Sequence, residues 1–220
     1  MKRRCAILAT VLGLALASSV GADESRRTVI VFGDSITAGG ALSKEERPHL
    51  WVTVVQQQSA GRLTMINEGK GGRPTDSLKE FEAMLTRQPK ADLLILALGT
   101  NDSRDISNAC VPKAVEHLRT MIKRARENYR ADLPVLMVGP PNINKDALGP
   151  TKPIANERDA KLRELGDAYA KLAQELHCEF VSLYGVVPAS SLTHDGVHPD
   201  AAGNEAIAKA LLRKLLPTHP

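Results

Sequence analysis

The most reactive combination of side chains in this sequence lies near its end, in the segment 191–200, SLTHDGVHPD. Asp195 precedes His198 by three residues, with a glycine between them and a proline directly after. Glycine and proline disfavour the interior of a helix, so we expect a loop here. In a loop, Asp195 can bind one ring nitrogen of His198 and leave the other to take a proton from a nucleophile elsewhere in the chain.

Ser35 is the candidate nucleophile. It lies in the segment 31–40, VFGDSITAGG, where an apolar run ends and a helix can begin. Asp34 or Ser35 would serve equally well as a plain helix cap, so this segment taken alone is weak evidence. A serine held at such a turn becomes a nucleophile when a nearby base removes its proton. The pattern is not the G-x-S-x-G turn of the α/β-hydrolases.

Two further segments offer hydrogen-bond donors. Asn101 lies in LALGTNDSRD (96–105), and its amide can donate to negative charge that develops on a substrate oxygen. Gly72 lies in NEGKGGRPT (67–75), and its backbone N–H can donate to the same point. The plainer interpretations are an ordinary turn residue for Asn101 and a positive φ angle for the glycine.

A metal site is the alternative interpretation of the segment 191–200. Its ligands would be His194, Asp195, His198 and Asp200. The sequence offers no second ligand cluster, and a metal site here would leave Ser35 and Asn101 without a role. The other histidines are expected on solvated faces: His49, His117, His177 and His219.

Apolar strand-like runs alternate with helical patterns along the chain. The expected strands are 28–33, 63–69, 92–99, 134–139 and 179–184, and the expected helices are 49–61, 75–88, 112–128, about 154–177 and about 200–216. This alternation is typical of one α/β domain with three layers, a parallel sheet between two layers of helices. Ligands bind beyond the carboxyl ends of such strands, and each candidate residue above follows a strand.

The first 22 residues have the pattern of a secretory signal peptide. Three basic residues precede an apolar run too short to span a bilayer, and small residues precede Asp23. The predicted organisation is a signal peptide, 1–22, and a single domain, 23–220. Removing the signal leaves 26 basic and 25 acidic residues, so the net charge falls from +4 to +1. This balance excludes a basic surface for nucleic acid or anionic membrane.

Cys110 and Cys178 are the cysteines of the domain. An even count in an exported protein suggests a disulfide. Cys110 follows the third expected strand and Cys178 precedes the fifth, so the two fall at opposite ends of the sheet. A six-residue strand is about 20 Å long, whereas bonded cysteines have Cα atoms about 4.4–6.8 Å apart. We therefore predict that they are not bonded to each other.

The chemically suggestive segments together resemble the four ordered sequence blocks of the SGNH (GDSL) hydrolases. The resemblance runs from about residue 28 to about residue 216 and rests on these residues: Gly33-Asp34-Ser35-Ile36-Thr37, Gly72, Gly99-Thr100-Asn101-Asp102, and Asp195 with His198. Any one block is common by chance, but four in order after successive strands are not. Ile36 stands where the family name has leucine, an exchange of one apolar residue for another.

The resemblance implies a flavodoxin-like five-stranded sheet and a serine nucleophile, Ser35, with His198 as its base and Asp195 as the partner of that base. It also implies an oxyanion hole formed by the N–H of Ser35, Gly72 and Asn101. The segment around Gly72 is crowded with glycine, so Gly69 or Gly71 remains an alternative donor.

The function implied by the resemblance is that of an exported serine esterase, periplasmic or secreted, that needs no metal, nucleotide or redox cofactor. Few aromatic residues and no apolar lid favour a short acyl group, such as acetyl, on a small molecule or carbohydrate. A lysophospholipase or thioesterase of the same fold is the alternative, and a non-catalytic ester- or carbohydrate-binding protein is the alternative from another class. No nucleic-acid partner and no stable membrane insertion after signal cleavage are expected.

Overall fold

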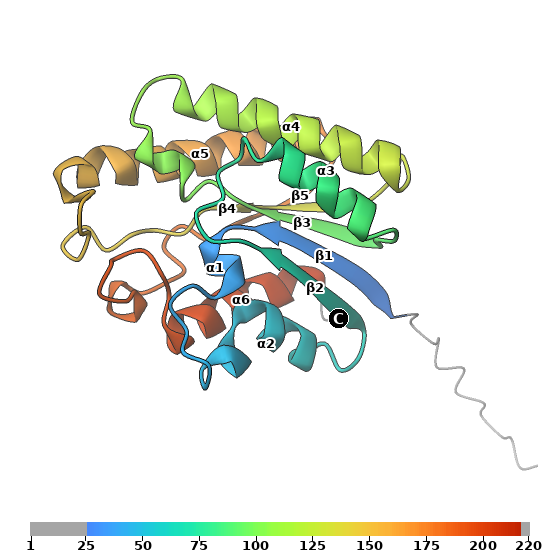
Figure 1. Ribbon diagram of the computed structural model, residues 1–220, viewed down its shortest axis with the longest axis horizontal. Coiled ribbons are helices and arrows are strands. Elements are labelled where there is room, and N and C mark those ends of the chain that lie inside the picture. Colours follow the sequence, from blue (N-terminus) through green and yellow to red (C-terminus); the bar gives the residue numbers. More distant parts are fainter. Residues whose placement is uncertain (1–25, 217–220) are drawn as a thin grey trace, which may run out of the picture.

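The computed structural model describes residues 26–216, so the predicted signal peptide lies outside the described residues. Five parallel strands form one sheet in the order β2-β1-β3-β4-β5 (Figure 1). Their bounds are β1 (Arg27–Gly33), β2 (Leu63–Gly69), β3 (Leu93–Ala97), β4 (Val135–Gly139) and β5 (Glu179–Ser182). This order is the flavodoxin-like arrangement, and the predicted fold class is therefore confirmed.

Helices cover both faces of the sheet (Figure 1). One face carries α3 (Leu78–Arg87), α4 (Cys110–Asn128) and α5 (Ala155–Glu175), and the other carries α1 (Ser35–Ala38), α2 (Trp51–Gln58) and α6 (Ala201–Leu215). Between residues 26 and 216, none of the helices combines the length and apolar character that a membrane span requires.

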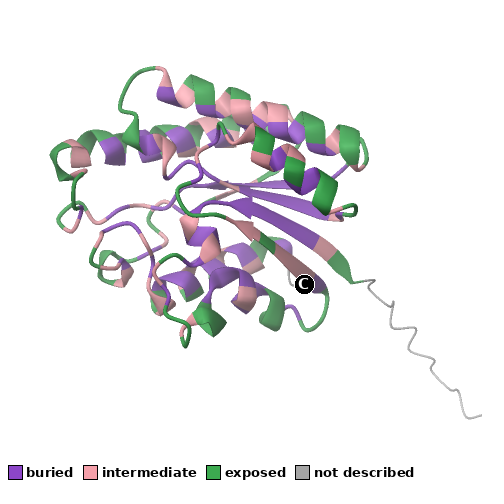
Figure 2. Cartoon of the chain, viewed as in Figure 1, coloured by how far each residue is buried: buried purple, intermediate pink, exposed green. Residues whose placement is uncertain are grey.

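Each face of the sheet has its own apolar core, because successive residues of a strand point to opposite sides. Ile30 and Phe32 of β1 pack with the helices α3, α4 and α5. Val29 and Val31 of the same strand pack with α2 and α6. The central strands are accordingly buried along most of their length (Figure 2). A rigid, doubly covered sheet fixes the positions of the loops at its carboxyl edge.

Two helices begin later than the sequence pattern predicts. The helix expected from His49 begins at Trp51, whose N–H is accepted by the side chain of Asn204 from α6. The helix expected from Thr75 or Asp76 begins at Leu78, because the N–H and hydroxyl of Thr75 are both bound to the carboxylate of Asp102. In both cases a contact from a distant part of the chain sets the boundary.

Cys110 and Cys178 are free in the structure, as the prediction requires. Cys110 is the first residue of α4, whereas the sulfur of Cys178 lies 3.6 Å from Nη2 of Arg126, close to the other end of that helix. A helix rises about 1.5 Å per residue, so most of the length of α4 separates the two thiols.

Candidate active site

Ser35 is the first residue of α1, and only Asp34 separates it from the carboxyl end of β1. The carboxylate of Asp34 caps this short helix by accepting the N–H of Ile36 at 2.9 Å. The turn needs a glycine before it, because a Cβ at Gly33 would lie 2.1 Å from the hydroxyl oxygen of Thr37. The Gly-Asp pair therefore sets the backbone from which the serine side chain projects.

The loop 191–200 places His198 beside Ser35, although the two residues are 163 positions apart in the sequence. Nε2 of His198 lies 2.8 Å from Oγ of Ser35, and Nδ1 of His198 lies 2.5 Å from Oδ2 of Asp195. The contact to Asp195 favours a proton on Nδ1 and leaves Nε2 as the acceptor that faces the serine hydroxyl. The three side chains thus form one continuous hydrogen-bonded chain.

Several backbone contacts fix the loop that carries His198. Gly196 has φ +71°, and a Cβ there would lie 2.4 Å from the carbonyl oxygen of Asn144. The N–H of Asn144 donates to the carbonyl of Gly196 at 2.8 Å, and the N–H of Thr193 donates to the carbonyl of His198 at 2.8 Å. The glycine between the acid and the histidine is therefore required by this close approach of backbone.

The carboxylate of Asp195 is held in its ionised form. Burial opposes ionisation, but hydrogen bonds from the His198 ring and from the backbone N–H groups of His198 and Val197 outweigh burial and lower the pKa of Asp195 below its usual range. Its Oδ1 also accepts the hydroxyl of Thr193 at 3.1 Å. A charged carboxylate at this point can stabilise a positive His198.

Asn101 lies beyond the end of β3, beside the loop after β2. Its Nδ2 donates to the carbonyl of Arg73 at 3.1 Å, which occupies one of its two amide hydrogens and leaves the second for a ligand. Of the three candidate glycines, Gly69 already donates its N–H to Oδ1 of Asn67 at 2.8 Å. Gly71 and Gly72 lie at the exposed tip of the turn, where Gly72 has φ +73°. Gly71 and Gly72 therefore remain as the candidate glycines whose backbone N–H could donate to the substrate oxygen.

Arg73 fixes the loop that carries these glycines, a role that the sequence alone did not indicate. Its guanidinium is buried, donates to the carbonyl oxygens of Gly33 and Glu68, and lies over the ring of Phe32. It also pairs with Glu80 at 3.0 Å. Arg73 therefore ties the loop after β2 to the end of β1, where the serine lies.

A second group of hydrogen bonds joins the loop after β2 to the loop after β3. Both oxygens of Asp102 accept the N–H of Thr75 at 3.1 Å, and Oγ1 of Thr75 lies 3.1 Å from Nδ1 of His117. The expectation that His117 lies on a solvated face is therefore wrong, since it is half-buried behind this network. His49 and His177 are exposed as expected, and His219 lies outside the described residues.

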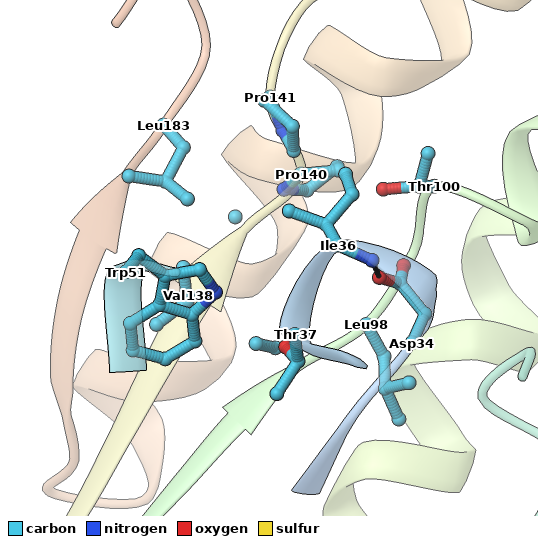
Figure 3. A pocket seen from close by; sticks show the side chains of 12 residues that line it. Asp34, Ile36, Thr37, Trp51, Leu98, Thr100, Val138, Pro140, Pro141 and Leu183 are labelled. Carbon is cyan, nitrogen blue, oxygen red and sulfur yellow. Dashed lines mark hydrogen bonds between the residues drawn. The ribbon is translucent and has the colours of Figure 1, made fainter. Parts of the chain in front are cut away.

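Beneath α1 lies a small cavity, drawn in Figure 3, with a volume of about 20 Å³. Apolar side chains such as Ile36, Trp51 and Leu183 line most of it, and the carboxylate of Asp34 lies on one side. Burial raises the pKa of Asp34 to about 6, although its hydrogen bond from Ile36 acts in the opposite direction. The volume suits about one water molecule and not an acyl tail.

The alternative metal ligands do not converge. The carboxylate of Asp200 caps α6 by accepting the N–H of Gly203 at 2.8 Å, and His194 is exposed. Among residues 26–216, no group of three or more His, Cys, Asp or Glu side chains has an arrangement that could hold a metal ion.

Comparisons with known proteins agree with this fold. A family model described as GDSL-like lipase/acylhydrolase matches residues 31–206. A multidomain esterase of Ruminococcus flavefaciens is 28% identical over 124 residues, which are 56% of this chain but only 15% of that protein. A GDSL lipase of Mycobacterium tuberculosis is 27% identical over 196 residues, covering 84% of this chain and 80% of that one.

Solved structures with the same fold include several named as esterases. A putative arylesterase from Agrobacterium tumefaciens has a TM-score of 0.70 and 29% identity, covering 86% of this chain and 98% of the other. A carbohydrate acetylesterase family member from Sinorhizobium meliloti has a TM-score of 0.68 and 25% identity, covering 87% of this chain and 100% of the other.

Proposed function

Because the chain belongs to the GDSL-like lipase/acylhydrolase family and is a serine ester hydrolase, we propose that it removes short acyl groups, acetyl on carbohydrate in particular, through an acyl intermediate on Ser35. The observation that carries the proposal is the hydrogen-bonded chain from Asp195 through His198 to Ser35. A binding protein without turnover would not need this chain of contacts.

The proposed reaction has two halves. In the first, Nε2 of His198 takes the proton of the Ser35 hydroxyl while Oγ bonds to the ester carbonyl carbon; the intermediate then expels the alcohol, which leaves with the proton from His198. In the second, His198 takes a proton from water while the water oxygen bonds to the acyl carbon; the bond from Oγ to the acyl carbon then breaks, His198 returns the proton to Oγ of Ser35, and the carboxylic acid leaves. The ionised Asp195 stabilises the positive His198 that forms in each half.

Charge on the ester oxygen requires donors in both halves of the reaction. We assign this role to the backbone N–H of Ser35, the N–H of Gly72 or its neighbour Gly71, and the free amide hydrogen of Asn101. The hydrogen bonds of Arg73 and Asp102 support the assignment, because they hold the glycine turn and Asn101 against the end of β1. Donors fixed before the reaction need no reorganisation as the charge forms.

The short acyl group is supported by the cavities beside the site. The cavity beneath α1 suits about one water molecule, and a larger one beside His198 has arginine, histidine and aspartate side chains among its lining residues. Neither is lined throughout by apolar side chains, as a channel for a fatty chain would be. The similarity to a carbohydrate acetylesterase family member supports a sugar ester, whereas the similarity to a GDSL lipase keeps lysophospholipid or thioester hydrolysis as the second candidate.

Export to the periplasm or the medium is also part of the proposal. It rests on the basic start, the apolar run and the small residues before Asp23 in the sequence. N-terminal sequencing of the protein purified from the culture medium or periplasm should return Asp23 as the first residue; Met1 would contradict the signal peptide.

A panel of 4-nitrophenyl esters from acetate to laurate, together with acetylated sugars, tests the proposed substrate class. We expect kcat/KM to fall steeply beyond butyrate, and Ser35→Ala to abolish turnover of every ester. If laurate exceeds acetate in kcat/KM, the lipid-active candidate replaces the acetylesterase.

A further inference from the structure

A cavity of about 440 Å³ opens beside His198, and two arginines are among the residues that line it. The residues that give it chemical character are Arg104, Thr151, Arg158, His194, Asp195 and His198. The proposed reaction uses only Asp195 and His198 of this set. The two arginines therefore need an explanation that acyl transfer alone does not provide.

Arg158, in the first turns of α5, is only 1% exposed. Its guanidinium binds neutral oxygens: Oγ of Ser103 at 3.1 Å, Oγ1 of Thr151 at 3.0 Å and the carbonyl of Thr100 at 3.4 Å. No carboxylate within residues 26–216 forms an ion pair with it. A buried guanidinium whose hydrogen bonds all go to neutral oxygens is costly, because no anion contacts it directly.

Arg104 brings a second positive charge to the same cavity. It is exposed, and nothing in the described part of the chain forms a hydrogen bond or ion pair with its guanidinium. Burial and then repulsion from Arg104 lower the pKa of Arg158 to about 10, and the charge of Asp195 acts in the opposite direction. An anion bound by both guanidinium groups would relieve the repulsion between them and supply a directly bonded counter-charge.

The position of the cavity indicates which part of an ester would enter it. In the proposed mechanism His198 returns its proton to the departing alcohol, so the alcohol oxygen must lie against the His198 ring. The cavity is lined on one side by His198, so the alcohol part of the ester would enter this cavity.

We propose that this cavity is a specificity site for an anionic group, a carboxylate or a phosphate, on the alcohol part of the substrate. The inference rests on the proposed function and deepens it: the preferred substrate is a short acyl ester of an acidic alcohol, such as an acetylated sugar acid or sugar phosphate. Arg158 supplies a buried guanidinium held by hydrogen bonds, and Arg104 supplies an exposed one.

Competition against 4-nitrophenyl acetate tests this proposal at low ionic strength. The competitors are glucuronate, glucose 6-phosphate, and the neutral analogues glucuronamide and glucose. We expect at least one anion to inhibit competitively with a Ki at least tenfold lower than either neutral sugar, and 0.5 M NaCl to reduce that advantage. The tighter of the two anions identifies carboxylate or phosphate as the recognised group.

Substitution of each arginine tests whether it causes the preference for an anionic over a neutral sugar. Arg104→Gln should reduce the ratio of anion to neutral affinity about tenfold, and Arg158→Lys, which keeps the charge but not the fork of donors, should reduce it several-fold. The matched control is Arg213→Gln. Arg213 is exposed in the last turn of α6, at the end of the sheet away from the site, where Arg27 at the start of β1 donates to the carbonyl of Leu215. This control should leave the ratio unchanged.

Calorimetric titration of the Ser35→Ala protein with glucuronate, glucose 6-phosphate and glucuronamide separates this inference from the proposed function. If neither anion binds more tightly than its neutral analogue, or if both arginine variants retain the preference, the specificity site is wrong even where Ser35-dependent hydrolysis is intact. If hydrolysis does not depend on Ser35 but anion binding still requires Arg104, the proposed function fails and the anion site stands.

Discussion

Asn101 combines a structural contact with a free donor. One amide hydrogen is bound to the carbonyl of Arg73, which aligns the side chain, and the second remains for the substrate oxygen. We expect Asn101→Ala to lower kcat for 4-nitrophenyl acetate about 10²–10³-fold with little change in KM, because the amide acts on charge that is present only in the transition state. The far-UV CD spectrum should be unchanged. A raised KM at normal kcat would place Asn101 in substrate binding instead.

Asp34 carries a buried carboxylate directly beside the proposed nucleophile. Its pKa in the folded protein is raised by burial from 3.8 to about 6. Between those two pH values the folded state binds a proton that the unfolded state does not, so this residue lowers the free energy of unfolding as the pH rises from 4 to 6. Asp195, whose pKa is lowered, has the opposite effect, and only below about pH 4.

Asp34→Asn removes the buried charge and keeps an oxygen that can accept the N–H of Ile36. We expect the free energy of unfolding of the variant, relative to wild type, to increase by up to about 3 kcal/mol between pH 4 and pH 7. Urea denaturation at both pH values measures this difference. A difference between the two proteins that is independent of pH would show that Asp34 has an ordinary pKa.

The loop between Leu192 and Pro199 shows how one element positions two reactive side chains. Gly196→Ala places a Cβ at φ +71° and against the Asn144 carbonyl, so the loop must move. We expect the variant to lose at least tenfold in kcat and about 1–3 kcal/mol of stability. The control is Gly166→Ala inside α5, where a Cβ meets nothing within 4 Å; it should retain activity and gain about 0.5–1 kcal/mol. Equal activity in both variants would contradict a fixed loop.

The helices and strands are predictable from sequence where the hydrophobic pattern is strong, whereas the residues at which they begin and end are less predictable. The five strands were found because β-branched and apolar runs end in glycine or polar residues, as in 28–33 and 134–139. The start of α3 was misplaced because Thr75, a good cap by type, binds Asp102 instead. The residues around Thr75 do not indicate that its partner lies 27 positions further along the chain.

The molecule as a whole explains why the candidate site was recognisable from sequence. In a parallel sheet of order β2-β1-β3-β4-β5, the loops after β1, β2 and β3 share one edge, and the loop before α6 returns to that edge. Ser35, Asn101 and His198 each follow a strand, so topology was sufficient to bring them together. The buried arginines were not recognisable, because charged residues are ordinarily exposed and only the packed structure shows that Arg73 and Arg158 lie inside.

The central claim is that Ser35 is the nucleophile activated by His198, and covalent labelling tests it most directly. The protein is treated with a fluorophosphonate, and intact mass and peptide mapping are recorded for wild type, Ser35→Ala and His198→Ala. The account predicts a single adduct on Ser35 in wild type, none in Ser35→Ala, slow labelling in His198→Ala, and loss of esterase activity in step with labelling. An adduct on another residue, or full esterase activity in Ser35→Ala, would contradict it.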